Sequence, residues 1–150
     1  MHKYITTNLI AFDFDGVIHN NCYTGCNSQI MDSDSDFGSV MDGALECIKS
    51  LQDLGFPVVI MSARKKHSIK KWLSGRIESK NLGLKFKCLP FWVRRYDNNQ
   101  IIGITNTKMI AKMYIDDRTL QFNGKFTDKF TKDILNFEPW HKKLNQIKNT

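Results

Sequence analysis

The sequence predicts a single α/β domain in three layers, built around a central and mostly parallel β-sheet. Short apolar runs alternate along the chain with stretches in which apolar residues recur at helical spacing. A length of 150 residues and a hydrophobic fraction of 41% suit one domain with its own core. We therefore expect strands joined by crossover helices, with ligands bound at the carboxyl ends of the strands.

Each predicted element is marked by its apolar pattern and by the residues that end it. Apolar runs predict strands at 9–12, 57–61, 84–89, 101–104 and 113–115, with the one at 84–89 near an edge of the sheet. Residues 43–54 predict a helix, and Ser68 should cap a second helix that carries Ile69, Trp72, Leu73 and Ile77. Thr127 should cap a last helix, stopped by Pro139. Polar residues 19–42 predict a flap inserted into a Rossmann-like sandwich.

The charge of the chain is +7 and is unevenly distributed. Residues 1–60 contain two basic and eight acidic residues, a net charge of −6. Residues 61–150 contain twenty basic and seven acidic residues, a net charge of +13. This asymmetry indicates either a positive surface that faces an anionic partner or a solvated, lysine-rich face with no partner.

The sequence shows no signal peptide and no apolar run near the roughly 20 residues that span a bilayer. We therefore expect a cytoplasmic protein with no membrane partner. In that compartment cysteines are ordinarily reduced thiols. We expect this state for all four, which are Cys22, Cys26, Cys47 and Cys88.

Polar side chains follow three of the predicted strands. Asp13 and Asp15 come after the first, Ser62 after the second, and Asp116-Asp117 after the run 113–115. Carboxyl ends of parallel strands meet at one edge, so the fold would gather four carboxylates there. Because like charges repel, such a cluster needs a cation, and Mg²⁺ prefers oxygen ligands. A carboxylate beside bound cationic charge can attack a phosphoryl group, and Gly16 permits the turn that follows.

These motifs resemble the haloacid dehalogenase (HAD) superfamily of phosphohydrolases, and most closely its small, nearly capless members, many of which bacteriophages encode. The resemblance runs from about residue 9 to about residue 126 and rests on segments 10–19, 58–64, 108–118 and 120–124. Four elements in this order, each at or beside a predicted strand end, make the likeness specific. It implies a HAD-like fold with a minimal cap and an open site, and it extends the cytoplasmic expectation to a virus-encoded protein in host cytoplasm.

The resemblance implies roles residue by residue. Asp13 would be the nucleophile that forms an aspartyl-phosphate, and Asp15 would protonate the leaving oxygen and later activate water. Ser62, with Ala63 and Arg64 beside it, would contact the phosphoryl group, and Lys108 would offset the charge there. The implied Mg²⁺ ligands are Asp13, Asp15 through its backbone carbonyl, Asp116 and Asp117. The expected function is a Mg²⁺-dependent phosphomonoester hydrolase, and the basic second half favours nucleotides or nucleic-acid terminal phosphates as substrates.

Several alternatives stay open. Lys112 could take the place of Lys108, and Arg64 could simply begin the basic face. His19, Cys22 and Cys26 could form part of a zinc site in the flap. The aromatic and basic segment 91–96 could stack bases and hold phosphates, or it could be an aromatic core segment with exposed arginines. The whole chain could be a catalytically weak nucleic-acid or protein binding module on the same fold, or a phosphotransferase.

Overall fold

The computed structural model describes residues 7–20 and 37–140 of the 150. The chain divides into two compact units, one ending at Ile115 and the other beginning at Asp116.

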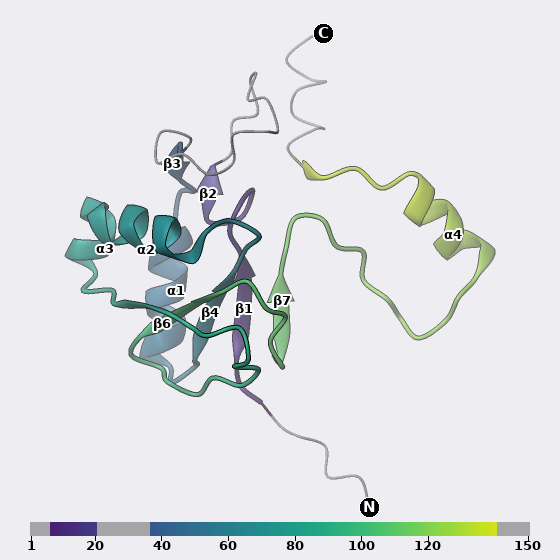
Figure 1. Ribbon diagram of the computed structural model, residues 1–150. Helices are drawn as coiled ribbons and strands as arrows, with labels where there is room; N and C mark the ends of the chain where they lie inside the picture. The colour runs from purple at the N-terminus through teal and green to yellow at the C-terminus, as the bar shows by residue number, and fades with distance from the viewer. Residues whose placement is uncertain (1–6, 21–36, 141–150) are drawn as a thin grey trace, which may run out of the picture. The chain divides into compact units, whose positions relative to one another are not determined.

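The first unit is built on a five-stranded sheet (Figure 1). Its strand order is β5-β6-β4-β1-β7, and all four pairings are parallel. The strands are β1 (Ile10–Asp13), β4 (Val58–Met61), β5 (Phe86–Cys88), β6 (Ile102–Thr105) and β7 (Met113–Ile115). The predicted α/β fold with a mostly parallel central sheet is confirmed, and so is the edge position of the strand at 84–89.

Alternation along β1 divides the core into two faces. Ile10 and Phe12 belong to a cluster that contains the apolar side chains of α1 (Ala44–Asp53) and α2 (Lys66–Gly75). Leu9 and Ala11 belong to a second cluster, on the opposite face, with Leu89 and Met109. Helices therefore cover one face, whereas the side chains that pack on the other come from the irregular chain between β5 and β7.

The boundaries of the second helix differ from the prediction. The helix begins at Lys66, so Ser68 lies inside its first turn and makes no N-cap. Arg76 has an extended backbone, with φ −72° and ψ 137°, and separates α2 from the short α3 (Ile77–Asn81). As a result Ile77 does not share the buried stripe of Ile69 and is 67% exposed.

The predicted flap begins and ends in a small hairpin. Strand β2 (His19–Asn20) pairs antiparallel with β3 (Ser39–Val40). Residues 21–36, with Cys22 and Cys26, lie outside the described residues. Of the remaining cysteines, Cys88 is partly buried and Cys47 is exposed; both are free thiols.

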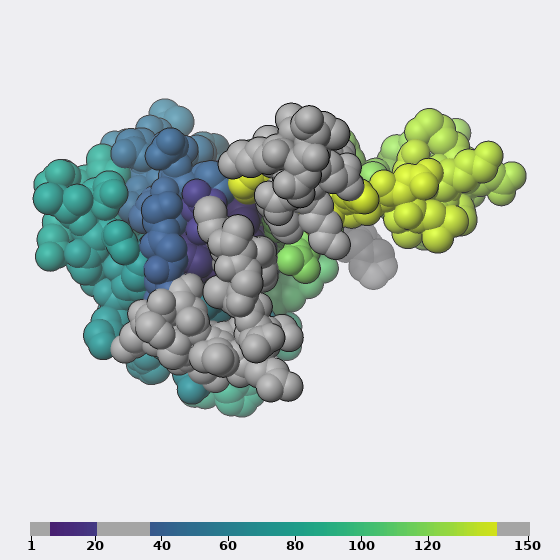
Figure 2. All heavy atoms as spheres, turned by 90° about the horizontal axis from the view of Figure 1, so that it is seen from above, coloured from purple at the N-terminus to yellow at the C-terminus, as the bar shows by residue number. Residues whose placement is uncertain are grey.

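The second unit contains α4 (Asp128–Leu135), shown in yellow-green in Figures 1 and 2. The Thr127 hydroxyl accepts a hydrogen bond from the Phe130 N–H at 3.1 Å, which confirms the predicted cap. The rings of Phe122, Phe126 and Phe130 contact one another. Across both units, no helix in the described ranges combines the length and apolar character that crossing a membrane requires.

Candidate functional site

The carboxyl edge of the sheet brings together two of the predicted site residues. Asp13 is the last residue of β1, and its register partner in β4 is Met61, so Ser62 follows one residue beyond. The Ser62 N–H donates to the carbonyl of Thr105 at the end of β6, 3.1 Å away. Asp13 and Ser62 are both partly buried, which leaves their polar groups within reach of a small ligand.

A tight turn after β1 separates Asp15 from Asp13. The strand ends at Asp13, and the Phe14 carbonyl accepts hydrogen bonds from the N–H groups of Ile18 and His19 at 3.0 and 2.9 Å. Gly16 has φ 83°, a left-handed backbone that side chains rarely adopt, as the predicted turn requires. The turn, and not the strand, therefore determines the position of Asp15.

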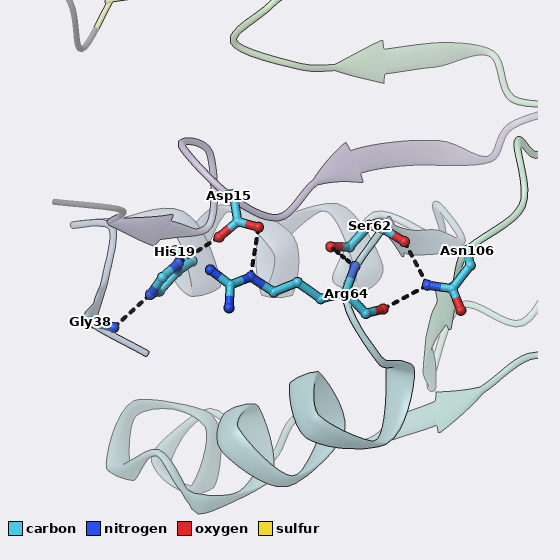
Figure 3. A network of polar contacts seen from close by, with 6 residues as sticks. All are labelled: Asp15, His19, Gly38, Ser62, Arg64 and Asn106. Atoms are coloured by element: carbon cyan, nitrogen blue, oxygen red, sulfur yellow. Dashed lines mark hydrogen bonds and ion pairs between the residues drawn. The ribbon is translucent and has the colours of Figure 1, made fainter. Parts of the chain in front are cut away.

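Asp15 is the centre of a polar network that spans three segments (Figure 3). Its Oδ1 lies 2.8 Å from Nδ1 of His19, and its Oδ2 accepts a hydrogen bond from Nε of Arg64 at 2.8 Å. The Gly38 N–H donates to Nε2 of His19 at 2.6 Å. Because an amide N–H can only donate, Nε2 accepts, and the ring proton lies on Nδ1 and faces Asp15. Both ring nitrogens of His19 thus have hydrogen-bond partners among the described residues.

The network keeps Asp15 ionised. Partial burial raises the pKa of its carboxyl, but the hydrogen bonds from His19 and Arg64, together with the charge of Arg64, lower that pKa by more. The net effect is a pKa below the ordinary value of 3.8. Arg64 is itself buried, with its side chain 5% exposed, so its charge is balanced inside the protein.

Aromatic rings hold the network in place. The His19 ring stacks on Phe14, with centroids 5.2 Å apart and planes inclined by 6°. The edges of Phe37 and Trp72 contact His19, and the Arg64 guanidinium lies 5.1 Å from the centre of the Phe37 ring. These contacts link the turn after β1 to the flap and to α2.

The loop after β4 is fixed by a residue that the sequence did not single out. Asn106 donates through Nδ2 to the carbonyls of Ser62 and Arg64 at 2.6 and 2.7 Å (Figure 3). The Ser62 hydroxyl accepts from the Arg64 N–H at 3.1 Å, and Ala63 between them is exposed. Asn106 lies 44 positions from Ser62 along the chain, so no local pattern could have revealed it.

The two candidate lysines contact different parts of the sheet. The Nζ of Lys108 lies 5.3 Å from the centre of the Tyr114 ring, and Tyr114 is the register partner of Ala11. Side chains of Ala11 and Asp13 share one face of the strand, so Lys108 is on the face of Asp13. Lys112, by contrast, donates its N–H to the Leu9 carbonyl at the amino end of β1, and its Nζ lies over Phe56. This placement favours Lys108.

Asp116 and Asp117 open the second unit. Within that unit, Oδ1 of Asp116 accepts a hydrogen bond from the Arg118 N–H at 2.8 Å, and its carbonyl accepts one from the Thr119 hydroxyl at 3.2 Å. A turn of this kind fixes the backbone of the aspartate pair immediately after β7.

Comparison of the chain with protein-family models, with curated proteins and with solved structures found no match.

Proposed function

We propose that the chain is a Mg²⁺-dependent phosphomonoester hydrolase of the HAD type that acts through an aspartyl-phosphate on Asp13. The observation that carries the proposal is the placement of Asp13 and Ser62 at the carboxyl ends of two paired parallel strands. Ligands of parallel α/β sheets bind at this edge. A nucleophilic carboxylate and a hydroxyl donor lie there side by side, with the cation of Lys108 on the face of Asp13.

The residues suit a two-step displacement. An oxygen of Asp13 attacks phosphorus, the bond from phosphorus to the ester oxygen breaks, and the leaving oxygen takes a proton from Asp15. Asp15 then takes a proton from water, whose oxygen attacks phosphorus and releases phosphate from Asp13. Ser62 donates a hydrogen bond to a phosphoryl oxygen, and Lys108 offsets the charge that gathers there.

Asp13, Asp116 and Asp117 are the side chains proposed to hold the cation. Ile115, the last residue of the first unit, pairs with Phe12, the residue before Asp13. All three residues offer the carboxylate oxygens that Mg²⁺ prefers. A bound cation would neutralise negative charge on the phosphoryl group.

The Asp15 carboxylate is not proposed as a cation ligand, because its two oxygens contact His19 and Arg64. The resemblance assigns its backbone carbonyl to the cation instead. To act as a proton donor, Asp15 must first be protonated, and its hydrogen bonds with His19 and Arg64 oppose that protonation. A phosphoryl dianion beside Arg64 would compete for the guanidinium and add negative charge, and both effects raise the pKa of a carboxyl. Substrate binding is therefore proposed to prepare the acid.

The test is phosphate release from p-nitrophenyl phosphate with Mg²⁺ and with EDTA. Asp13→Asn should lose at least about a hundredfold in kcat/KM, since it removes the nucleophile. Hydroxylamine should trap the acyl phosphate in wild type only. Asp53→Asn is the matched control, because Asp53 is exposed on α1 and pairs with Lys49 on the same helix. Equal turnover by wild type and Asp13→Asn, or turnover unaffected by EDTA, would refute the proposal.

A second candidate is a nucleic-acid binding module with little turnover. The exposed rings of Phe91 and Trp92 and the positive charge of the sequence around them favour it. Under this alternative, salt-dependent oligonucleotide binding would be the same in wild type and Asp13→Asn, and no phosphorylated compound would be turned over.

A further inference from the structure

Two large aromatic side chains stand exposed just beyond the end of β5. Phe91 is 71% exposed and Trp92 is 68% exposed. Their ring centroids are 5.1 Å apart and the ring planes are inclined by 86°, so the rings present differently directed surfaces. The sequence left open whether the segment 91–96 is core or a stacking surface. Phe91 and Trp92 are exposed and therefore outside the core, whereas Val93 and Tyr96 of the same segment pack against it.

Hydrogen bonds connect this aromatic pair to the candidate site. The Thr107 hydroxyl donates to the Phe91 carbonyl at 2.9 Å, and the preceding residue, Asn106, donates to the Ser62 carbonyl. Farther back, the Leu89 N–H donates to the Ile104 carbonyl at 2.8 Å, so the chain leaves β5 still aligned with β6. Phe91 and Trp92 are therefore at the same carboxyl edge of the sheet as Ser62.

The part of the sequence that contains the aromatic pair is rich in basic residues. Residues 61–115 contain thirteen basic and two acidic residues, a net charge of +11. Arg94 donates to the Lys108 carbonyl at 3.3 Å, and Lys66 donates to the Leu89 carbonyl. The Lys66 ammonium therefore contacts the chain two residues before Phe91, and Arg94 follows Trp92 by two residues. Lys65, at the N-cap of α2, is also exposed.

We propose that the substrate is the phosphorylated end of a single-stranded nucleic acid, whose terminal bases stack on Phe91 and Trp92. The proposal rests on the proposed phosphatase function. Unpaired bases stack on exposed rings irrespective of sequence, whereas bases in a duplex are already stacked on one another. Basic residues that precede and follow the rings along the chain match a charged backbone of several phosphates better than a single nucleotide.

The test compares kcat/KM on 5′- and 3′-phosphorylated oligothymidylates with kcat/KM on p-nitrophenyl phosphate. Trp92→Ala and Phe91→Ala should each lower the ratio of kcat/KM on the oligonucleotide to kcat/KM on p-nitrophenyl phosphate at least about fivefold, because each removes a ring on which a base stacks. Phe126→Ala, which removes another exposed ring far along the chain, should leave the ratio unchanged. An unchanged ratio in both ring variants would overturn the proposal. Absence of turnover on p-nitrophenyl phosphate would instead count against the phosphatase function.

Binding gives a measurement that does not depend on turnover. Fluorescence anisotropy of a labelled, 5′-phosphorylated oligothymidylate should show affinity that falls as salt rises. Trp92→Ala should weaken binding at least about fivefold at every salt concentration and leave the salt slope unchanged, since the ring carries no charge. Binding of wild type to phosphatidylserine vesicles and not to the oligonucleotide would assign the surface to a membrane and overturn the proposal. Equal affinity for duplex and single strand would also overturn it.

Discussion

Replacing Asp15 with asparagine should reveal how strongly the buried network holds the first unit together. The substitution keeps the size of the side chain and removes the charge that faces Arg64. The Arg64 side chain is only 5% exposed, so its charge would remain inside the protein without the carboxylate. Breaking a buried ion pair in this way costs about 3–5 kcal/mol. Because the Asp15 side chain is 19% exposed, we expect the lower end, about 3 kcal/mol.

Thermal unfolding followed by circular dichroism measures this cost. At about 2–4 °C per kcal/mol for a chain of this size, the Tm should fall by roughly 6–12 °C. Asp53→Asn makes the same chemical change in an exposed pair with Lys49, and it should change stability by less than about 1 kcal/mol. Adding Arg64→Met to Asp15→Asn removes the stranded charge and should restore much of the loss. Stability of Asp15→Asn close to wild type, or no recovery in the double variant, would refute the argument.

Three further predictions concern other parts of the chain. Burial, followed by the charge of Asp97, raises the pKa of Tyr96 above the ordinary value of 10.0. The neutral Tyr96 side chain therefore contributes stability that is complete below pH 10.0 and is lost as pH rises through the folded-state pKa. Urea titrations at alkaline pH should show this loss in wild type and not in Tyr96→Phe. A Cβ on Gly103 would lie 2.7 Å from Leu89 Cδ1, so Gly103→Val should cost about 1–3 kcal/mol in urea unfolding. Thr127→Ala removes the cap of α4 and should weaken that helix by about 1 kcal/mol, seen as faster amide hydrogen exchange in residues 128–135.

The strands were predictable because each apolar run is short and ends in polar residues. The predicted strand at 57–61 corresponds to β4 and the one at 113–115 to β7. Helix boundaries were less predictable than the strands. Ser68 looked like a cap, but the backbone of Lys65 is already extended and the helix starts after it. The single helical stripe from Ile69 to Ile77 failed because the extended conformation of Arg76 starts a new helix, and apolar spacing alone carries no signal for such a break.

In the site, the residues that end strands were predictable and their partners were not. Asp13 and Ser62 follow apolar runs, so the topology alone places them at one edge. Arg64 reaches Asp15 across 49 positions, and Asn106 reaches Ser62 across 44. Such contacts depend on which strands become neighbours, which the sequence pattern did not specify. His19 was considered as a zinc ligand together with Cys22 and Cys26, which lie outside the described residues; the contact of its ring with Asp15 had no signal in the sequence.

The uneven charge of the sequence has two distinct physical consequences. Of the thirteen basic residues between 61 and 115, all of them described, Arg64 alone is buried. A buried charge is tolerated only when it is paired, and Arg64 is paired with Asp15 from the acidic first part of the chain. The other twelve remain partly or fully exposed, where solvent and salt screen the repulsion among them. One cation thus belongs to the Asp15 network, whereas the rest keep contact with solvent, where a bound anion would reduce the repulsion among its neighbours.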